Sequence, residues 1–547
     1  MHDAGIGVMA AALLFVVLFW RLGTPTFWDP DEAHYAETSR EMIATGDWWA
    51  PHFNEQPFFD KPVLFHQLQA AAMRSIADPE LGARTVPALA ALGLVAATYW
   101  FAAVLISRDV AAVAALMIAA SPGLFALSRY AILDTLFTLF TFGGAAMLSV
   151  AALRDRPRLQ WAGYVALALG VLVKGPIALV LTALTMIVLI AASADLRRRL
   201  LGLNWFVGLL LIVVLSAPWF AYMYFRFRQD FVNGYVLDEN LRLFAASRFA
   251  NQPGFWFYFR ILAAGLLPWT GLLVGRMIDD LRCLWRGEQV DHVETMLWAW
   301  TGVIVGFFTA STFKLDHYVF PAAPALCILC ARAWTDVRLH RGDRSTAASR
   351  LGLRLIGPFL VAVGVGCGYF VIARLALPRE ALIVPIVVTS AGIALTVLAT
   401  VRGARPPRVP WLATTALLVT YGGIIAFVLP ALEQRKVVAQ MAEWVAAHAR
   451  PTDHMCSFRM NRWAPAYRLY VGRHVHMLEV SAAAAAFLRR AEPFYCVMRR
   501  DAYEEFVNQG AKLHVVLERE GMAVTSGRAL FRVPQPPARY VVVTQAR

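Results

Sequence analysis

Long apolar segments, separated by short polar connections, recur along the first 430 residues. Thirteen of them approach the length of about 20 residues that crosses a bilayer as a helix. They are Gly5–Trp20, Val86–Ile106, Val110–Leu127, Leu133–Leu153, Trp161–Val173, Ile177–Ala192, Trp205–Tyr222, Phe255–Val274, Thr295–Ala310, Tyr318–Ala331, Leu355–Ile372, Ala381–Ala399 and Trp411–Leu429. The pattern therefore predicts an α-helical polytopic membrane domain of about thirteen spans over residues 1–430.

The arginines predict how these spans are oriented. They occur in alternate connections, at Arg108, Arg154, Arg156, Arg158, Arg197, Arg198, Arg199, Arg276, Arg282, Arg286, Arg332, Arg338, Arg341, Arg344, Arg350, Arg402, Arg405 and Arg408. Short cytoplasmic loops are enriched in such residues. The N-terminus is then inside, and the intervening loops, like everything after Pro430, lie on the outer face.

After Leu429 the pattern changes to that of a small α/β domain, predicted for residues 431–547. Helices are expected at Ala431–His448, Ser481–Arg490 and Asp501–Asn508. Short runs of β-branched and aromatic residues predict strands at His454–Arg459, His474–Glu479, Phe494–Arg499, Leu513–Arg519, Ala529–Val533 and Tyr540–Val543.

Composition agrees with the membrane interpretation. The chain is 59% hydrophobic with a mean hydropathy of +0.54, which excludes an ordinary soluble protein. Its net charge of +14 does not indicate nucleic-acid binding, because the arginines cluster in short loops between apolar spans, where they act as topology signals.

The six cysteines give little evidence of chemistry. Cys327 and Cys330 have C-x-x-C spacing, but they lie within an apolar span and lack a second ligand pair, which favours packing over metal binding. Cys456 and Cys496 lie in the C-terminal domain, where an outer location would allow a disulfide between them.

One connection is unlike the others. The segment Phe27–Pro62 lies between two apolar spans, within a first outer loop of residues 24–84, and is dense in charged and aromatic side chains. Its charged residues are Asp29, Asp31, Glu32, Glu37, Arg40, Glu41, Asp47, Glu55, Asp60 and Lys61. A loop that only joined two spans would need none of them.

A helix is predicted within this segment, over Pro30–Thr45. Asp29 suits the N-cap, Pro30 suits the first helical position, and Glu32 has the spacing of a capping box. Gly46 is expected to end the helix. Asp31 and Glu32 could serve only the helix dipole, but Asp31 is free of the capping role and Tyr35 lies one turn beyond it.

The same residues carry a resemblance. Pro30-Asp31-Glu32, Tyr35-Ala36-Glu37, Gly46-Asp47-Trp48 and Phe59-Asp60-Lys61-Pro62 resemble the first periplasmic loop of bacterial glycosyltransferases of the protein mannosyltransferase-like group, and within it the lipid A aminoarabinose transferases. The resemblance is specific in this loop, runs loosely through the membrane region, and is weak over the last hundred or so residues.

The resemblance implies the GT-C fold and an inverting enzyme of the bacterial inner membrane, with its active site and C-terminal domain in the periplasm. It implies transfer of 4-amino-4-deoxy-L-arabinose from undecaprenyl phosphate to a phosphate of lipid A. That reaction would lower the negative charge of the outer membrane and the binding of polymyxin and other cationic peptides. No obligatory cofactor is expected.

Candidate site residues follow from the chemistry of such a donor. The leaving phosphate needs cations at the membrane surface, for which the resemblance implies Lys61 most strongly, with Lys174, Arg242 and Lys314 as helpers. A carboxylate is needed beside the anomeric carbon or the acceptor, and the resemblance implies Asp31 and Asp134, with Glu32 a weaker candidate. Tyr35, Asp60, Arg129 and Tyr318 are expected to line the site.

Two questions stay open at this stage. Asp31 could act as a general base, or it could orient the sugar and pair with its ammonium group, because a phosphate acceptor scarcely needs a base. A divalent ion could bind among Asp31, Asp60, Asp134 and His317, although no ligand spacing demands one.

Other functions also remain. A related transferase could move another polyprenyl-linked sugar, such as mannose, to a protein or glycan. A transporter of lipid-linked saccharides would place its polar groups near the bilayer midplane, whereas here the unusual charges collect at one face. A non-catalytic scaffold would leave those outer-loop charges unexplained.

Overall fold

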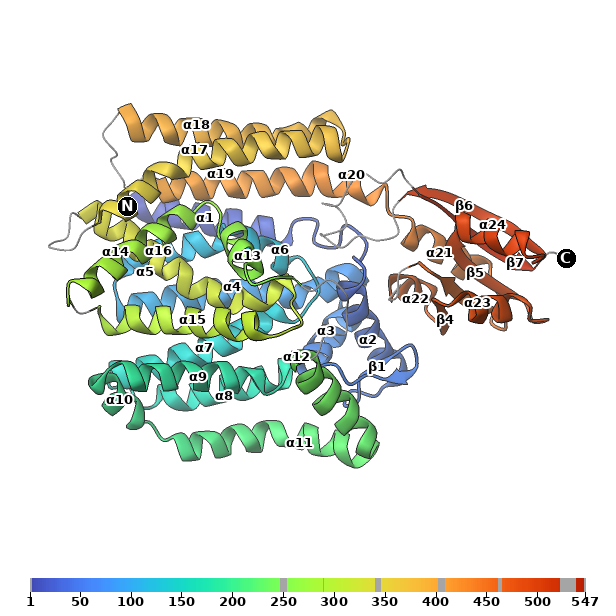
Figure 1. Cartoon of the computed structure of the whole chain (residues 1–547), viewed down its shortest axis with the longest axis horizontal. Helices are drawn as coiled ribbons and strands as arrows, with labels where there is room; N and C mark the ends of the chain where they lie inside the picture. Colours follow the sequence, from blue (N-terminus) through green and yellow to red (C-terminus); the bar gives the residue numbers. More distant parts are fainter. Residues whose placement is uncertain are drawn as a thin grey trace.

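The apolar segments form a bundle of helices whose axes run side by side (Figure 1). The computed structural model describes residues 2–245, 253–288, 290–339, 346–401, 409–460, 465–521 and 538–545. The helices of the bundle are α1 (His2–Phe19), α4 (Pro79–Leu105), α5 (Arg108–Ala119), α6 (Pro122–Ser128), α7 (Asp134–Leu153), α8 (Leu159–Lys174), α9 (Ile177–Ala192), α10 (Ala194–Leu201), α11 (Trp205–Phe231), η1 (Val232–Arg242), α12 (Leu243–Ala245), α13 (Phe257–Gly265), α14 (Thr270–Trp285), α15 (His292–Ala310), η2 (Asp316–Ala322), α16 (Ala323–Leu339), α17 (Ala347–Tyr369), η3 (Phe370–Arg374), η4 (Arg379–Leu382), α18 (Ile383–Val401), α19 (Val409–Gly423) and η6 (Ile424–Val428).

The bundle confirms a multi-pass membrane architecture. Among the described residues, 8 helices are long and apolar enough to cross a membrane, or up to 10 when each of two bent pairs counts as one span, and α8 and α9 are shorter apolar helices. The predicted span Phe255–Val274 is wrong as a single helix, because α13 and α14 meet at 117°. Pro268 lies at this break, and proline cannot donate the hydrogen bond that would continue the helix.

The charged first loop folds between the bundle and the C-terminal domain (Figure 1). It contains α2 (Asp31–Thr45), the two-residue strands β1 (His52–Phe53) and β2 (Gln56–Pro57), and α3 (Leu64–Ser75). Gly46 ends α2 as predicted, with a φ of 73° that glycine adopts without strain.

The predicted capping role of Asp29 is wrong. Pro30 occupies the N-cap of α2 and no side chain caps the helix there. Asp29 is instead buried, and its Oδ1 accepts a hydrogen bond of 2.9 Å from the backbone N–H of Ala466 in the C-terminal domain. Asp29 thus contacts a residue distant in the sequence instead of capping the helix that follows it.

The C-terminal domain is a mixed sheet with helices packed on it. Its elements are α20 (Leu429–Glu433), α21 (Val438–His448), β3 (His454–Phe458), α22 (Pro465–Val471), β4 (Val475–Leu478), α23 (Ser481–Leu488), β5 (Phe494–Arg499), α24 (Arg500–Asn508), β6 (Leu513–Gly521) and β7 (Ala538–Gln545). The strand order is β4-β3-β5-β7-β6, with β3 parallel to β4 and β5, and β7 antiparallel to β5 and β6.

Most predicted elements of this domain are present, with two differences. The helix predicted over Ala431–His448 is interrupted between α20 and α21, and α22 was not predicted. The strand predicted at Ala529–Val533 lies outside the described residues. Cys456 and Cys496 are buried, face each other in register on β3 and β5, and are free thiols here.

Helices α14 and α17 cross at small residues. A Cβ on Gly275 would lie 2.5 Å from the carbonyl oxygen of Ala348 and 2.7 Å from the Cα of Ser349, both of which are backbone atoms. The Asp279 carboxylate fixes the same crossing, because it accepts hydrogen bonds of 3.2 and 2.8 Å from the backbone N–H groups of Ala348 and Ser349. Small residues allow this close approach of helices within a membrane.

We therefore expect Gly275→Ala to lower the apparent Tm of the detergent-purified protein, because neither backbone can give way and overpacking costs about 1–3 kcal/mol. Gly302→Ala in α15 is the matched control, since a Cβ there meets nothing within 4 Å. Equal Tm values for the two variants would contradict this account of the crossing.

Candidate functional site

The site lies at the end of the bundle that faces the first loop. Asp134, the first residue of α7, is 2% exposed, and its carboxylate pairs with the ammonium group of Lys174, the last residue of α8. The Lys174 ammonium also lies 4.5 Å from the centre of the Tyr318 ring. Two helix ends and the η2 segment thus bring a carboxylate, a cation and a phenol ring together.

His317 links this pair to a further carboxylate. Its Nε2 lies 3.6 Å from Oδ2 of Asp134, and its Nδ1 lies 3.2 Å from Oδ1 of Asp316. Asp316 is largely exposed, with 60% of its side chain accessible, whereas Asp134 is enclosed. The site therefore grades from a buried ion pair to a solvent-facing carboxylate.

Asp31 stands opposite these groups, in the first turn of α2. Burial raises the pKa of Asp31, and the charges of His317, Asp316 and Asp134 act on it, the histidine in the opposite direction to the two carboxylates. Within the described part of the chain, no hydrogen bond or ion pair of the Asp31 carboxylate is present. Its oxygens are therefore available to a substrate.

Tyr35 lies one turn beyond Asp31 on α2. Its ring stacks on His66 at 5.4 Å and meets Phe65 edge-on at 5.6 Å. Burial raises the pKa of the Tyr35 phenol well above its usual value, and Asp134, Asp60 and Asp31 add to the shift. Tyr35 is thus a neutral hydroxyl group at the wall of the site.

Lys61 supplies a second cation. Its Nζ lies 3.6 Å from Oε2 of Glu239 in η1 and donates a 2.9 Å hydrogen bond to the carbonyl oxygen of Asp60. The Lys61 side chain is 17% exposed. Its charge acts on the pKa of Asp31, so it belongs to the same electrostatic cluster.

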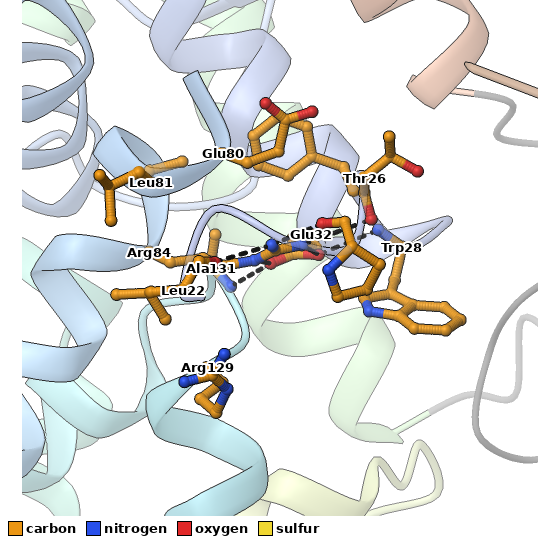
Figure 2. Close-up of polar contacts among 12 residues, drawn as sticks. Leu22, Thr26, Trp28, Glu32, Glu80, Leu81, Arg84, Arg129 and Ala131 are labelled. Atoms are coloured by element: carbon orange, nitrogen blue, oxygen red, sulfur yellow. Dashed lines mark hydrogen bonds and ion pairs between the residues drawn. The ribbon is translucent and has the colours of Figure 1, made fainter. Parts of the chain in front are cut away.

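Glu32 is turned away from this cluster. It is fully buried and forms a two-pronged ion pair with Arg84, in which Nε and Nη2 donate hydrogen bonds of 2.7 and 2.8 Å (Figure 2). It also accepts backbone N–H bonds from Ala131 and Trp28, at 2.8 and 2.9 Å. This set of partners favours a positioning role for Glu32 over the predicted catalytic one.

Arg129 also points away from the substrate cluster. Its guanidinium donates hydrogen bonds of 2.9, 3.1 and 3.0 Å to the carbonyl oxygens of Val17, Leu18 and Arg21. The last carbonyls of a helix have no partner within the helix. Arg129 therefore satisfies the C-terminal end of α1, and Figure 2 shows it apart from the Glu32–Arg84 pair, below the pair in that view.

Two predicted phosphate ligands are held elsewhere in the structure. Lys314 is buried and donates to the carbonyl oxygen of Ser311, just after α15. Arg242, at the end of η1, pairs with Asp238 at 2.6 Å and is 65% exposed. Neither is within an ion-pair distance of the cluster described above.

The structure thus brings together Asp31, Tyr35, Lys61, Asp134, Lys174 and Tyr318, with Asp60 and His317 at the edge. It adds Asp316 in η2 and Glu239 in η1, which were not predicted as site residues. In the sequence, Asp316 is next to His317 and Glu239 lies three residues before Arg242. Their closeness to these candidates was the signal that could have identified them. Among the described residues, no three His, Cys, Asp or Glu side chains are arranged to hold a metal ion.

This arrangement suits transfer of a group from an anionic leaving group. Two lysine ammonium groups can neutralise a phosphate, and fixed charges act strongly in a site that excludes water. Carboxylates nearby can accept a proton, stabilise positive charge at a reacting carbon, or bind a cationic substituent.

The fold is shared with two solved structures. The crystal structure of ArnT from Cupriavidus metallidurans bound to undecaprenyl phosphate aligns over 98% of this chain and 98% of that chain, with a TM-score of 0.74 and 21% identity. The archaeal oligosaccharyltransferase AglB from Archaeoglobus fulgidus aligns with a TM-score of 0.53 and 12% identity, over 93% of this chain and 68% of that chain.

Sequence comparison identifies the proteins that the chain resembles. Residues 8–232 match the family of dolichyl-phosphate-mannose-protein mannosyltransferases. The undecaprenyl phosphate-α-4-amino-4-deoxy-L-arabinose arabinosyl transferase of Aeromonas hydrophila is 32% identical over 344 residues, 61% of each chain. Its counterpart from Edwardsiella ictaluri is 30% identical over 66% of this chain and 64% of that protein. The chain thus matches somewhat less than two thirds of the length of these relatives.

The contribution of the Glu32–Arg84 ion pair to stability can be tested by mutation. Arg84→Met should destabilise the protein by about 3–5 kcal/mol, because a buried carboxylate loses its partner, and the carbonyl oxygens of Leu22 and Pro25 lose the 3.0 and 2.6 Å bonds from Nη1. Thermal unfolding in detergent measures the effect. Arg74→Met, at an exposed position of α3, is the control; an equally small shift for both would show that the pair does not organise this region.

Proposed function

We propose that this chain is an inverting membrane glycosyltransferase that transfers 4-amino-4-deoxy-L-arabinose from undecaprenyl phosphate to a phosphate of lipid A. The observation that carries the proposal is the joint placement of Asp31, Asp134, Lys61 and Lys174 at one end of a GT-C bundle. The names of the most similar relatives support the sugar and the donor. The reaction would lower outer-membrane negative charge and give resistance to polymyxin and other cationic peptides.

The proposed location is the bacterial inner membrane, with the site and the C-terminal domain in the periplasm. The arginine-bearing connections between α4 and α5, between α7 and α8, and between α9 and α11 lie at the bundle end opposite Asp134. That distribution agrees with the positive-inside rule.

In this proposal the donor phosphate binds Lys61 and Lys174. The lipid phosphate would replace Glu239 as the partner of Lys61, while Lys174 keeps its contact with Asp134. Arg242 lies on the same η1 segment as Glu239 and could reach the donor only if that segment moves, and Lys314 would act through its position rather than by contact.

The reaction itself is a single displacement. A phosphate oxygen of lipid A attacks the anomeric carbon, the bond between that carbon and the undecaprenyl phosphate oxygen breaks, and undecaprenyl phosphate leaves as an anion. Asp31 is placed to orient the sugar or to pair with its ammonium group, and Asp134 is held by Lys174. Charges that develop on the leaving oxygen are stabilised by cations already in position.

The placement of the charges favours transfer over transport. A transporter of lipid-linked saccharides would present polar groups near the bilayer midplane. Here Asp134 and Lys174 occupy the terminal residues of α7 and α8, and Asp31 and Lys61 lie in the first loop.

The test is mass spectrometry of lipid A from cells that lack their own aminoarabinose transferase but make the donor. We expect aminoarabinose on lipid A with the wild-type chain, and a loss of about 100-fold or more with Asp31→Asn, the typical contribution of a positioned acid or base. Asp230→Asn, at an exposed position of α11, is the control. Unmodified lipid A in cells with folded wild-type protein would reject this sugar and acceptor; full activity of Asp31→Asn would reject the role of Asp31.

The raised pKa of Asp31 predicts the pH dependence. Because burial favours the neutral acid, ionisation occurs above the ordinary value of 3.8. If the carboxylate is the active form, kcat/KM falls as the pH drops through this raised pKa, so the acid limb lies at a higher pH than for an exposed aspartate. An acid limb at about pH 4 or below in purified protein would show that Asp31 is not the group that titrates.

A further inference from the structure

The C-terminal domain contacts the helix that carries Asp31. Helix α22 packs against α2 at the junction of the first loop and the C-terminal domain, where both can be followed in Figure 1. Neither the sequence of α22 nor the residues around this helix suggest that it binds a substrate. The contact is instead made by charged side chains that are almost completely buried.

Arg468 is the centre of this contact. It is 2% exposed, its Nε lies 3.1 Å from Oε1 of Glu37, and its Nη2 donates a 3.1 Å hydrogen bond to Oε1 of Glu41. Glu37 and Glu41 are one turn apart on α2 and are themselves buried. One guanidinium from the C-terminal domain therefore bridges two successive turns of the helix.

Two further ties place the domain on the loop. The Asp29 carboxylate accepts the backbone N–H of Ala466, two residues before Arg468. The side-chain amide of Asn54, in the β1–β2 turn, both donates to and accepts from the backbone of Val475, at 3.0 and 3.1 Å. The turn is also tied to α2, because Glu41 accepts the backbone N–H of Glu55 at 3.0 Å.

Helix α2 is consequently held from two sides. The bundle holds its first turn through Glu32 and Arg84, and the C-terminal domain holds its middle through Glu37, Glu41 and Arg468. Asp31 precedes Glu32 in the first turn of α2 and lies close enough to Asp134 for that charge to act on its pKa, so its position relative to Asp134 depends on how α2 is held.

We propose that Arg468 is a positioning residue for transfer: through its ion pairs with Glu37 and Glu41, the C-terminal domain holds Asp31 in place opposite Asp134. This inference rests on the proposed function for its activity readout. It gives the C-terminal domain a part in the reaction without any contact to the reacting atoms.

The physical reason is charge. Without Arg468, two carboxylates one turn apart remain buried, and Arg40 alone stays paired with Glu37. Burial already raises the pKa of Glu37 to about 7 in the intact structure. Loss of the guanidinium favours movement of this face of α2 toward water, and a displacement of about 1 Å can lower a reaction rate about 100-fold.

The test compares Arg468→Met, which keeps the apolar stem, with Arg468→Lys, which keeps the charge but loses the planar guanidinium that reaches both carboxylates. Arg489→Met, at an exposed position of the same domain, is the matched control. Transfer of aminoarabinose to lipid A is measured below the Tm of every variant, together with the Kd for undecaprenyl phosphate. We expect kcat to fall about 10- to 100-fold in Arg468→Met, with partial recovery in Arg468→Lys and a Kd within about twofold of wild type.

Hydrogen exchange supplies a readout that does not need activity. Amides of Asp31–Thr45 should exchange faster in Arg468→Met, while those of α7 keep their protection. Glu41→Gln removes the charge on the α2 side of the same contact. This variant is used in place of Arg468→Met if Arg468→Met does not fold. Wild-type transfer rates and unchanged α2 protection in a folded variant would overturn the inference. An inactive wild type would instead reject the proposed function, and hydrogen exchange would still decide the role of Arg468.

Discussion

The buried ion pair between Glu32 and Arg84 is the constraint on which the arrangement of the site depends. A charge taken out of water loses several kcal/mol of hydration, and the pair recovers that loss only in one geometry. Arg84 comes from α4 and also binds carbonyl oxygens just after α1, while Glu32 comes from α2 and binds the backbone at Ala131, just before α7. Four parts of the chain are therefore fixed relative to one another a few residues from Asp31 and Asp134.

The same principle explains why α2 has so many acidic residues and so few of them face the site. Glu37 and Glu41 meet Arg468, Glu32 meets Arg84, and the carboxylate that stays available to substrate is Asp31. Each of the other three has an arginine from another part of the chain as an ion-pair partner, and Glu37 is also paired with Arg40 of α2 itself. The charge density that marks α2 in the sequence is thus mostly structural, and among the described residues Asp31, in the first turn, is the acidic residue of α2 with no ion pair.

Local patterns were enough to predict most helices of the bundle, the end of α2 at Gly46, and most strands of the C-terminal domain, because each depends on hydrophobic spacing or on one residue's backbone preference. They did not predict the breaks between α5 and α6 and between α13 and α14. Asp31, Asp134, Lys61 and Lys174 could be proposed from their position near span ends and from the family resemblance. The roles of Glu32 and Arg129 could not, since their partners lie about 50 and 110 residues away, and a sequence gives no sign of which arginine reaches which carboxylate. Helix α22 was missed for a related reason: its seven residues are too few for a periodic pattern, and it is stabilised by what it packs against.

The cations of the site are already paired with carboxylates before any substrate arrives, Lys174 with Asp134 and Lys61 with Glu239. An incoming phosphate must therefore compete with a carboxylate, which weakens the binding of a simple anion. A donor that carries both a phosphate and an ammonium group meets less of this obstacle. Its phosphate can pair with Lys61 while its ammonium group pairs with Asp31 or Glu239, and Lys174 stays paired with Asp134. Such an exchange keeps every charge paired in a poorly hydrated site. Under the proposed function, this pairing of charges favours a zwitterionic lipid-linked sugar over a neutral one.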